Sequence, residues 1–570
     1  MYLRSAMLLS MLSVLAMPAF GQVVLAPATP VIGSSNPVSP EPPVPKPGTT
    51  PCAVPILTNV AFNDYGTRPI TFAPPASCPG PWAKVVLTAD FTVTAGRQYD
   101  RTAKFFLGGA NIYFGTTAEP RAALSPSWHI ERDLTDYSAL FTAPQTGLAY
   151  IQNVVNSTYT GVIYASATLL FYPANADTPA PVVPSEVLSL TPNNTYSLNT
   201  TTDAQSATFT LPRNVERAYL DVISQSQGND EFWYTCVPND VADILENCGN
   251  TGFRETEVAI DGQPAGVAPV YPWIYTGGID PYLWEPIPGV ETLNFKPYRV
   301  DLTPFAGVLS DGNPHTVSVS VFNADSRFDE ASNLLLYTDP GASTVTGGVS
   351  TDTLTAEPSP NVQHYLNVGG DGTVSGPVTV TSSRAWMISG YVDTSHGRVS
   401  TTIEANNDFR NIQDETVYTN GPTFASIIFK QNVQQETTQQ ELTTTVSPAG
   451  EVQTLHNVDY PLDVYTNESP ESNSNGLFVA SAVTQGKIEQ LRSPFGANSP
   501  NPVVTSESIS TSDTLHYNSD ASVLLSHDNN AATSSYGAKD AEHNCVYREL
   551  DAQNLKLTGF EDSTSCSLAP

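Results

Sequence analysis

The sequence predicts an all-β protein: two tandem jelly-roll-like β-sandwiches followed by a β-rich C-terminal region. Two observations lead to this prediction. Charged residues make up only 14% of the 570-residue chain, which leaves little material for long surface helices. Runs rich in β-branched and aromatic residues recur between Gly, Pro and Asn turns, a pattern typical of short sheet strands.

The N-terminus predicts export. Arg4 precedes an apolar run that is too short to span a bilayer, and small residues follow before Gln22. This pattern predicts a signal peptide over residues 1–21 and a secreted or periplasmic protein. Residues 22–51 are dense in Pro, Ser and Gly, so we expect an extended, flexible linker there.

Strand-like runs divide the rest of the chain. A first β-sandwich is expected over residues 52–175 and a second over 176–340, with a Pro-rich joint between them. Residues 341–570 form the C-terminal β-rich region, where segments such as GPVTVTSS, AWMISGYVDT and RVSTTIEA predict short antiparallel strands. Short helices are expected only in connections, for instance around DVADILEN.

The charge balance restricts the partners. With 24 basic and 56 acidic residues the net charge is −32, and such a surface repels nucleic acid and anionic membranes. The eight histidines are scattered and no CxxC occurs, so no metal site is expected. Nucleophile-elbow, HExxH, Walker and dinucleotide motifs are absent as well. We therefore expect a monomer without cofactors, nucleic acid or membrane partners.

Six cysteines in an exported chain predict disulfides. They fall into three local couples, and the simplest of the 15 possible connectivities joins neighbours. These couples are Cys52 with Cys78, Cys236 with Cys248, and Cys545 with Cys566.

Polar and aromatic residues concentrate in two segments, 96–128 and 228–284. The first contains GRQYDR, in which Asp100 and Arg101 stand just before an expected strand. A carboxylate there can activate water as a general base, and a neighbouring guanidinium can keep it ionised or orient sugar hydroxyls. On composition alone, a surface ion pair at a strand entrance is the favoured alternative.

Several longer segments resemble one enzyme family. GRQYDR, TTAEP, NVVNSTYTG, DEFWY, RETEVAIDGQPAG, YTGGIDPYLWEPI and LTPFAGVLSDGNPH occur in the order found in almond-type peptide-N-glycanases. The resemblance implies hydrolysis of the bond between asparagine and the first N-acetylglucosamine of N-glycoproteins and glycopeptides. It also implies release of the glycan, conversion of Asn to Asp, and tolerance of core α1,3-linked fucose.

GRQYDRTAKFFLGG also resembles, more distantly, the catalytic segment of peptide-N-glycosidase F. That likeness implies that Asp100 is the essential carboxylate, that Arg101 contacts the ligand, and that the cleft lies between the sandwiches. The chain departs from the pattern at two supporting glutamates, which align with Asn153 and Asn250.

Two other acids are therefore candidates for a second catalytic carboxylate. Glu119 precedes Pro120, which restricts its backbone to an extended form suited to a fixed loop. Glu231 stands beside three aromatic residues, where partial burial would raise its pKa and make it a proton donor. A solvated turn acid and a structural strand end are the respective alternatives.

Eight residues are candidate substrate contacts, either as rings that stack on sugars or as polar groups that bond to them. They are Arg101, Asn153, Asp230, Trp233, Arg254, Glu255, Trp273 and Trp284. Adjacent strand residues point to opposite faces, and the sequence does not decide which face lines a cleft. For the tryptophans, burial in the core is the alternative.

Two other functions compete with the amidase. An endo-acting glycoside hydrolase also needs paired carboxylates, but it would leave one sugar on asparagine. A non-catalytic carbohydrate-binding protein would share the sandwiches and aromatic rings and would have no need of Asp100.

Overall fold

The computed structural model describes residues 30–419, 427–471, 476–493, 503–518, 520–540 and 544–566. The expected signal peptide lies outside these residues. Strands form most of the regular structure, which confirms the all-β prediction. The helical elements are short: α1 (Asn239–Ala242), α2 (Ala306–Leu309), η1 (Thr135–Phe141), η2 (Gly228–Asp230), η3 (Trp233–Thr235), η4 (Pro281–Trp284) and η5 (Thr303–Phe305).

Two four-stranded antiparallel sheets form the first sandwich. Their inward side chains alternate with outward ones and share one core, in which Phe91, Phe105, Phe141 and Phe171 are fully buried. One sheet has the order β1 (Cys52–Phe62), β8 (Ile163–Pro173), β3 (Trp82–Val93), β6 (Ser127–Asp133). The other has the order β2 (Arg68–Phe72), β7 (Gln145–Ile151), β4 (Thr102–Leu107), β5 (Ala110–Thr116).

The second sandwich pairs a five-stranded with a four-stranded sheet around Leu220, Val258, Val319 and Leu334. The first sheet contains β10 (Tyr196–Leu198), β17 (Arg327–Thr338), β12 (Val215–Gln227), β15 (Tyr298–Asp301) and, beside β17, β9 (Glu186–Ser189). The second contains β11 (Gln205–Thr210), β16 (Pro314–Phe322), β13 (Glu255–Ile260) and β14 (Gln263–Pro269).

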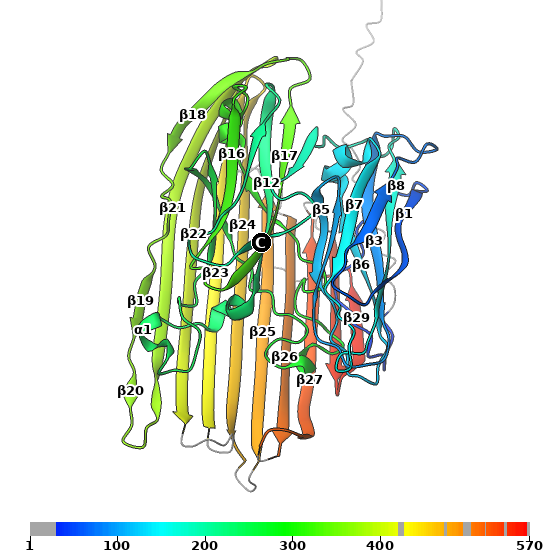
Figure 1. Ribbon diagram of the computed structural model, residues 1–570. Coiled ribbons are helices and arrows are strands. Elements are labelled where there is room, and N and C mark those ends of the chain that lie inside the picture. Colours follow the sequence, from blue (N-terminus) through cyan, green and yellow to red (C-terminus); the bar gives the residue numbers. More distant parts are fainter. Residues whose placement is uncertain are drawn as a thin grey trace, which may run out of the picture.

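The C-terminal region is one twelve-stranded antiparallel sheet whose long strands run side by side (Figure 1). The prediction of short strands here is wrong. GPVTVTSS and AWMISGYVDT belong to a single strand, because the alternation of buried and exposed side chains continues without a break from one to the other. The strands are β18 (Thr346–Asp352), β19 (Asn361–His364), β20 (Asn367–Val368), β21 (Val374–Thr394), β22 (Gly397–Thr419), β23 (Ile427–Ser447), β24 (Gly450–Pro470), β25 (Leu477–Arg492), β26 (Val503–Tyr517), β27 (Leu524–Lys539), β28 (Cys545–Gln553) and β29 (Lys556–Ser563).

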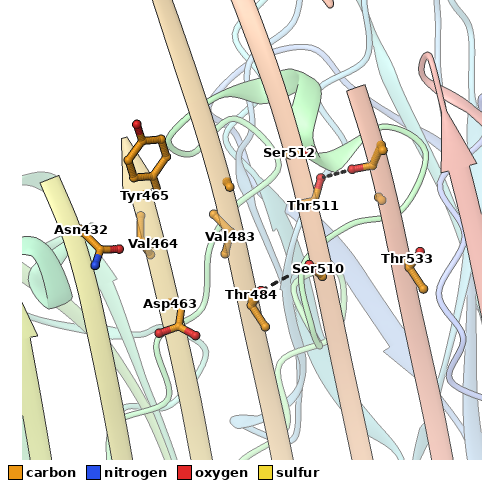
Figure 2. A pocket seen from close by; sticks show the side chains of 13 residues that line it. Asn432, Asp463, Val464, Tyr465, Val483, Thr484, Ser510, Thr511, Ser512 and Thr533 are labelled. Atoms are coloured by element: carbon orange, nitrogen blue, oxygen red, sulfur yellow. Dashed lines mark hydrogen bonds between the residues drawn. The ribbon is translucent and has the colours of Figure 1, made fainter. Parts of the chain in front are cut away.

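The two faces of this C-terminal sheet differ. Its inner face shares a core with the loops of the second sandwich. Its outward face carries short hydroxylated and polar side chains. A hollow of about 340 Å³ lies on this face. A hydrogen bond from the Thr484 hydroxyl to the Ser510 hydroxyl crosses it (Figure 2). Asp463 and Tyr465 lie at one side of this hollow.

Residues 30–51, which we call the N-terminal strap, form an extended chain without regular structure. The strap is not the free linker that its composition suggests. Val38 N–H donates to the Pro286 carbonyl, and the Lys46 ammonium pairs with Glu131 at 2.5 Å. Proline fixes the extended form, and the remaining donors and charged groups bind the body of the protein.

The cysteines form two of the three expected pairs. Cys236 is bonded to Cys248 and Cys545 to Cys566. Cys52 and Cys78 are both free, so the third predicted disulfide is not present. The two thiols are neighbours nevertheless: the Cys78 thiol donates to the Phe171 carbonyl, and Phe171 is the strand partner of Cys52. Burial and the adjacent Cys52 thiol raise the pKa of Cys78 to about 11.

Neither a membrane helix nor a metal cluster is found in the described part of the chain. None of its helices is long and apolar enough to cross a bilayer. Within the same residues, no three His, Cys, Asp or Glu side chains lie where they could hold a metal ion together.

Candidate functional site

A tight hairpin brings two candidate carboxylates together. Gly108 and Gly109 both have positive φ and form the two-residue turn between β4 and β5, a conformation that favours glycine. The register pairs the start of β4 with the end of β5, so Asp100, just before β4, meets Glu119, just after β5. The Asp100 backbone N–H donates to Glu119 Oε2 at 3.0 Å.

The second sandwich supplies the third carboxylate. Glu231 follows β12 and the single turn η2. It lies near enough to Asp100 and Glu119 for both carboxylates to raise its pKa. Asp100, Glu119 and Glu231, which we call the carboxylate cluster, thus meet where the two sandwiches join.

Residues 274–285, the site loop, close the cluster from the second sandwich. Gly277 N–H donates to Asp100 Oδ2 at 3.0 Å, and the Thr276 hydroxyl donates to the Thr117 carbonyl at 2.7 Å. The first sandwich and the site loop are therefore joined by hydrogen bonds from two adjacent loop residues.

Burial and mutual repulsion dominate the electrostatics of the cluster. Burial raises the pKa of Glu119 to about 7, reinforced by Asp100, and the pKa of Glu231 to about 7, reinforced by Asp100 and Glu119. Burial also raises the pKa of Asp100, but the Gly277 N–H and the Arg101 cation oppose that rise. The Asp100 backbone N–H and the Arg101 cation oppose the rise at Glu119 in the same way.

Arg101 lies behind the cluster and is 5% exposed. Its guanidinium stacks on the Tyr99 ring, 3.4 Å from the ring centroid, while Nε donates to the Gln152 carbonyl and Nη1 to Gln98. These partners hold Arg101 beneath the surface, and its contact with a ligand stays a prediction. Its charge still acts on Asp100.

Asp230 and Arg254 are structural rather than substrate-binding. They form a fully buried ion pair at 2.8 Å. Asp230 Oδ2 also accepts three backbone N–H groups from the turn between β16 and β17, at residues 325–327. Because Asp230 immediately precedes Glu231, this network fixes the backbone from which Glu231 projects.

The remaining predicted contacts also stay predictions, and each of these side chains is almost wholly buried. Asn153 is not exposed and bonds the carbonyls of Phe62 and Gly161. Glu255 binds Arg384 of the C-terminal sheet at 2.5 Å. The three tryptophans belong to the shared core, with exposed fractions of 0%, 4% and 2%: Trp233, Trp273 and Trp284.

Two partly exposed tyrosine rings lie close to Asp100 along the chain or beside its neighbour. Tyr99 and Tyr159 are partly exposed and meet edge to face with ring centroids 4.6 Å apart. The Arg97 guanidinium lies over Tyr159, 5.4 Å from the ring centroid. Arg97 and Tyr99 belong to GRQYDR, the segment that also contains Asp100.

The space beside Gly277 leads to a prediction. A Cβ at this position would fall 2.3 Å from Glu119 Oε2 and 3.0 Å from Asp100 Oδ2. Gly277→Ala should therefore displace both carboxylates and lower the kcat/KM of any reaction that they catalyse by about a hundredfold.

The matched control is Gly370→Ala, because a Cβ at Gly370 would meet no atom within 4 Å. Steady-state kinetics of both variants decide the matter. Equal rates in the two variants would contradict the placement of Gly277.

The arrangement suits hydrolysis by paired carboxylates. Asp100, with its charge stabilised, can take a proton from water, while an acid whose pKa lies near neutrality can give one to a leaving group. The fold brings the groups together without a metal centre among the described residues.

Comparisons with known proteins give consistent matches. The family model described as peptide N-acetyl-β-D-glucosaminyl asparaginase amidase A matches residues 39–338. A curated relative from Prunus dulcis, peptide-N4-(N-acetyl-β-glucosaminyl)asparagine amidase A, is 29% identical over 474 residues, covering 79% of this chain and 80% of the relative.

Solved structures give weaker likenesses, each of which covers 50% of this chain. PNGF-II has a TM-score of 0.37 at 14% identity, over 65% of its own chain. Recombinant peptide:N-glycanase F has a TM-score of 0.33 at 16% identity, over 96% of its own chain.

Proposed function

Because the chain belongs to the peptide N-acetyl-β-D-glucosaminyl asparaginase amidase A family, we propose that it releases N-glycans from glycoproteins and glycopeptides by hydrolysing the asparagine–N-acetylglucosamine amide. The observation that supports this most is the carboxylate cluster. Its three members and Gly277 all lie within the matched residues 39–338. They meet at the junction of the two sandwiches, and each of the three carboxylate residues is partly exposed.

In the proposed reaction, Asp100 is the base. Its ionised carboxylate, held by the Gly277 N–H at 3.0 Å, takes a proton from water as the oxygen attacks the side-chain carbonyl carbon of the glycosylated asparagine. A C–O bond forms at this carbon, and the amide C–N bond between the same carbon and the nitrogen then breaks, while the nitrogen stays bonded to the sugar. The asparagine becomes aspartate, and the sugar leaves as a glycosylamine.

Glu231 is the proposed proton donor to the departing nitrogen. No hydrogen-bond donor or cation offsets its burial, which raises its pKa to about 7, so below neutrality it holds the proton that this step requires. Glu119 is the proposed positioning carboxylate, because it accepts the Asp100 backbone N–H and fixes the backbone that carries the base.

Sugar contact is proposed at Tyr99 and Tyr159. Both rings are partly exposed and contact each other, and Tyr99 directly precedes Asp100 in the chain. Aromatic faces and nearby donors such as the Arg97 guanidinium suit the apolar faces and hydroxyls of a pyranose.

The glycan range is proposed to include core α1,3-fucosylated structures, on the strength of the family resemblance. Cleavage of two glycopeptides that differ only in that fucose, followed by mass spectrometry, tests this range. Cleavage of the unfucosylated glycopeptide alone would contradict it. The N-terminal pattern supports export as a further proposal, tested by sequencing the N-terminus of the mature protein.

Mass spectrometry of an N-glycopeptide after incubation in heavy-oxygen water tests the reaction itself. The amidase should convert Asn to Asp with one heavy oxygen in the new carboxyl group and no sugar remaining. A single sugar left on asparagine would instead indicate an endo-acting glycosidase. Unchanged glycopeptide would indicate a non-catalytic carbohydrate-binding protein. Each of these last two results would refute the proposed amidase.

Glu231→Gln and Glu119→Gln should behave differently. Glutamine at 231 cannot donate the proton in the same way, so kcat should fall about a hundredfold or more. Glutamine at 119 can still accept the Asp100 N–H through its amide oxygen, so a smaller loss is expected. Because a proton donor is used up as pH rises through its pKa, wild-type kcat should fall above about pH 7, and Glu231→Gln should lose this dependence.

The pH profiles of kcat for wild type and both variants provide the measurement. The result could also be the reverse: kcat still falls at alkaline pH in Glu231→Gln and no longer falls in Glu119→Gln. Glu119 would then be the proton donor and Glu231 the positioning carboxylate.

A further inference from the structure

A second carboxyl pair lies outside the carboxylate cluster, under the site loop. Asp280 starts η4, where its Oδ1 accepts the Tyr282 backbone N–H at 2.9 Å. The residue is 1% exposed, and Oδ2 is buried without a hydrogen-bond partner among the described groups. A buried anionic oxygen without a donor is costly, so this carboxyl group needs a proton or a donor.

The opposite member of the pair is Asp513 on the inner face of β26. It too is 1% exposed. Its Oδ1 lies 3.3 Å from Nδ1 of His527, while its Oδ2 is buried without a donor among the described groups. The carboxyl groups of Asp280 and Asp513 lie within hydrogen-bonding reach of each other. One proton between them satisfies both unpartnered oxygens.

Other contacts join the same part of the site loop to the C-terminal sheet. The Thr511 hydroxyl donates to the Leu283 carbonyl at 2.9 Å, and the Asn530 amide donates to the Tyr282 carbonyl at 2.8 Å. The Tyr282 ring stacks on the His527 ring with centroids 5.2 Å apart. The sheet thus binds the loop through backbone carbonyls, a ring pair and the carboxyl pair.

From the carboxyl pair the chain leads directly to the cluster. Asp280 N–H donates to the Gly278 carbonyl at 2.7 Å, and the Trp284 indole donates to the same carbonyl at 2.8 Å. Gly278 follows Gly277, whose N–H holds Asp100. A shift of Asp280 therefore moves a hydrogen bond to the proposed base.

We propose that Asp280 and Asp513 share one proton, and that Asp513 is a positioning residue through which the C-terminal sheet holds the site loop against Asp100. The positioning role rests on the proposed amidase function, whereas the shared proton does not.

The surroundings of the pair support a retained proton. Burial raises the pKa of Asp280 to about 7, with the Tyr282 N–H opposing and Asp513 reinforcing the rise. Burial likewise raises the pKa of Asp513 against the effect of His527. Tyr282 and Tyr517 are the other titratable groups that face the pair, from η4 and β26. The Thr514 backbone N–H and the Asn530 side chain also oppose the rise at Asp513.

The pH dependence has a definite sign. An acid whose folded-state pKa is raised keeps a proton that the unfolded chain gives up above about pH 4. The contribution of the pair to the stability of the fold therefore falls as the pH rises above about 4. Above about pH 7 the shared proton is lost as well, and two buried anions then face each other. The loop should then loosen from the sheet.

Asp513→Asn tests the shared proton. The amide NH₂ can donate to Asp280 without any ionisation, and the amide oxygen can still accept from His527. The melting temperature of this variant minus that of wild type should rise by about 2 °C between about pH 5.5 and 8.5. Asp463→Asn, on the outward face of the same sheet, removes one charge elsewhere and should show no such trend.

The positioning role needs a second readout. The ratio of kcat/KM between Asp513→Asn and wild type should rise about threefold over the same pH range, since titration of the carboxylate cluster is common to both enzymes and cancels. A melting difference that is constant with pH, or equal to that of Asp463→Asn, would overturn the shared proton. A rising melting difference with a constant rate ratio would overturn the positioning role.

The two proposals fail in different ways. If wild type cleaves no glycopeptide at any pH, the amidase assignment fails while the melting curves still decide whether the proton is shared. If Asp513→Asn does not fold, Asp280→Asn supplies the reciprocal amide and should give the same melting trend. A flat trend there also refutes the shared proton.

Discussion

Asp100→Asn is expected to lower the rate of glycan release by about a thousandfold or more. The asparagine oxygen can still accept the Gly277 N–H, so the local hydrogen bond at 3.0 Å survives. A neutral amide cannot take a proton from water, so only the chemical step is lost. Single-turnover kinetics on one defined glycopeptide measure the effect.

The control separates chemistry from folding. Asp90→Asn changes an acid on β3 of the same sandwich whose side chain is 68% exposed, and it should leave the rate unchanged. Both variants should melt within about 2 °C of wild type. A rate for Asp100→Asn within tenfold of wild type would remove Asp100 from the mechanism.

Asp230→Ala is expected to cause the largest loss of stability, about 3–5 kcal/mol. The change leaves the fully buried Arg254 guanidinium without its anion and frees the three backbone N–H groups at 325–327. Turnover should fall as well, because the neighbouring Glu231 loses its fixed backbone. The midpoint and slope of urea unfolding measure the stability.

Asp240→Ala is the matched surface variant. Its side chain is 69% exposed and pairs only with His364, so the urea midpoint should not move measurably. Equal midpoints for Asp230→Ala and Asp240→Ala would show that the buried pair does not hold this part of the fold together.

The meeting of the three carboxylates could be predicted in part from the sequence. Gly108 and Gly109 between two apolar runs indicate a tight hairpin, and a hairpin brings the residues before and after it together. That places Asp100 beside Glu119. The approach of Glu231 from another sandwich depends on how the two sandwiches pack, which no local pattern specifies.

The burial of the predicted sugar contacts could not be foreseen for a different reason. Trp233, Trp273 and Trp284 have the right chemistry, but a ring at a loop can point inward as easily as outward. The C-terminal sheet decides the matter, since it supplies apolar partners such as Phe409 and Tyr460 that draw the tryptophans and their neighbours into a core. The smaller rings Tyr99 and Tyr159 remain partly exposed, away from that sheet.

Asp230, Arg254 and Glu255 show the same limit for polar groups. In sequence, an acidic or basic residue near a candidate site looks functional. In the fold these three are buried and fully engaged, since a desolvated charge must find a partner. Their partners, such as Arg384 for Glu255 at 129 residues' separation, lie too far along the chain to be recognised in advance.

The N-terminal strap sets the order in which the protein can be completed. The Ser35 hydroxyl donates to the Leu555 carbonyl across a separation of 520 residues, and Gly33 and Ser34 bond to Leu557 at the start of β29. The strap is therefore synthesised about 520 residues before these partners. The Val38 N–H, on the same strap, donates to the carbonyl of Pro286, the residue that follows the site loop. Docking of this part of the strap should consequently be a late event with an entropic cost for joining segments far apart in the chain, and a chain truncated before β29 should leave Gly33 and Ser34 without their partner Leu557.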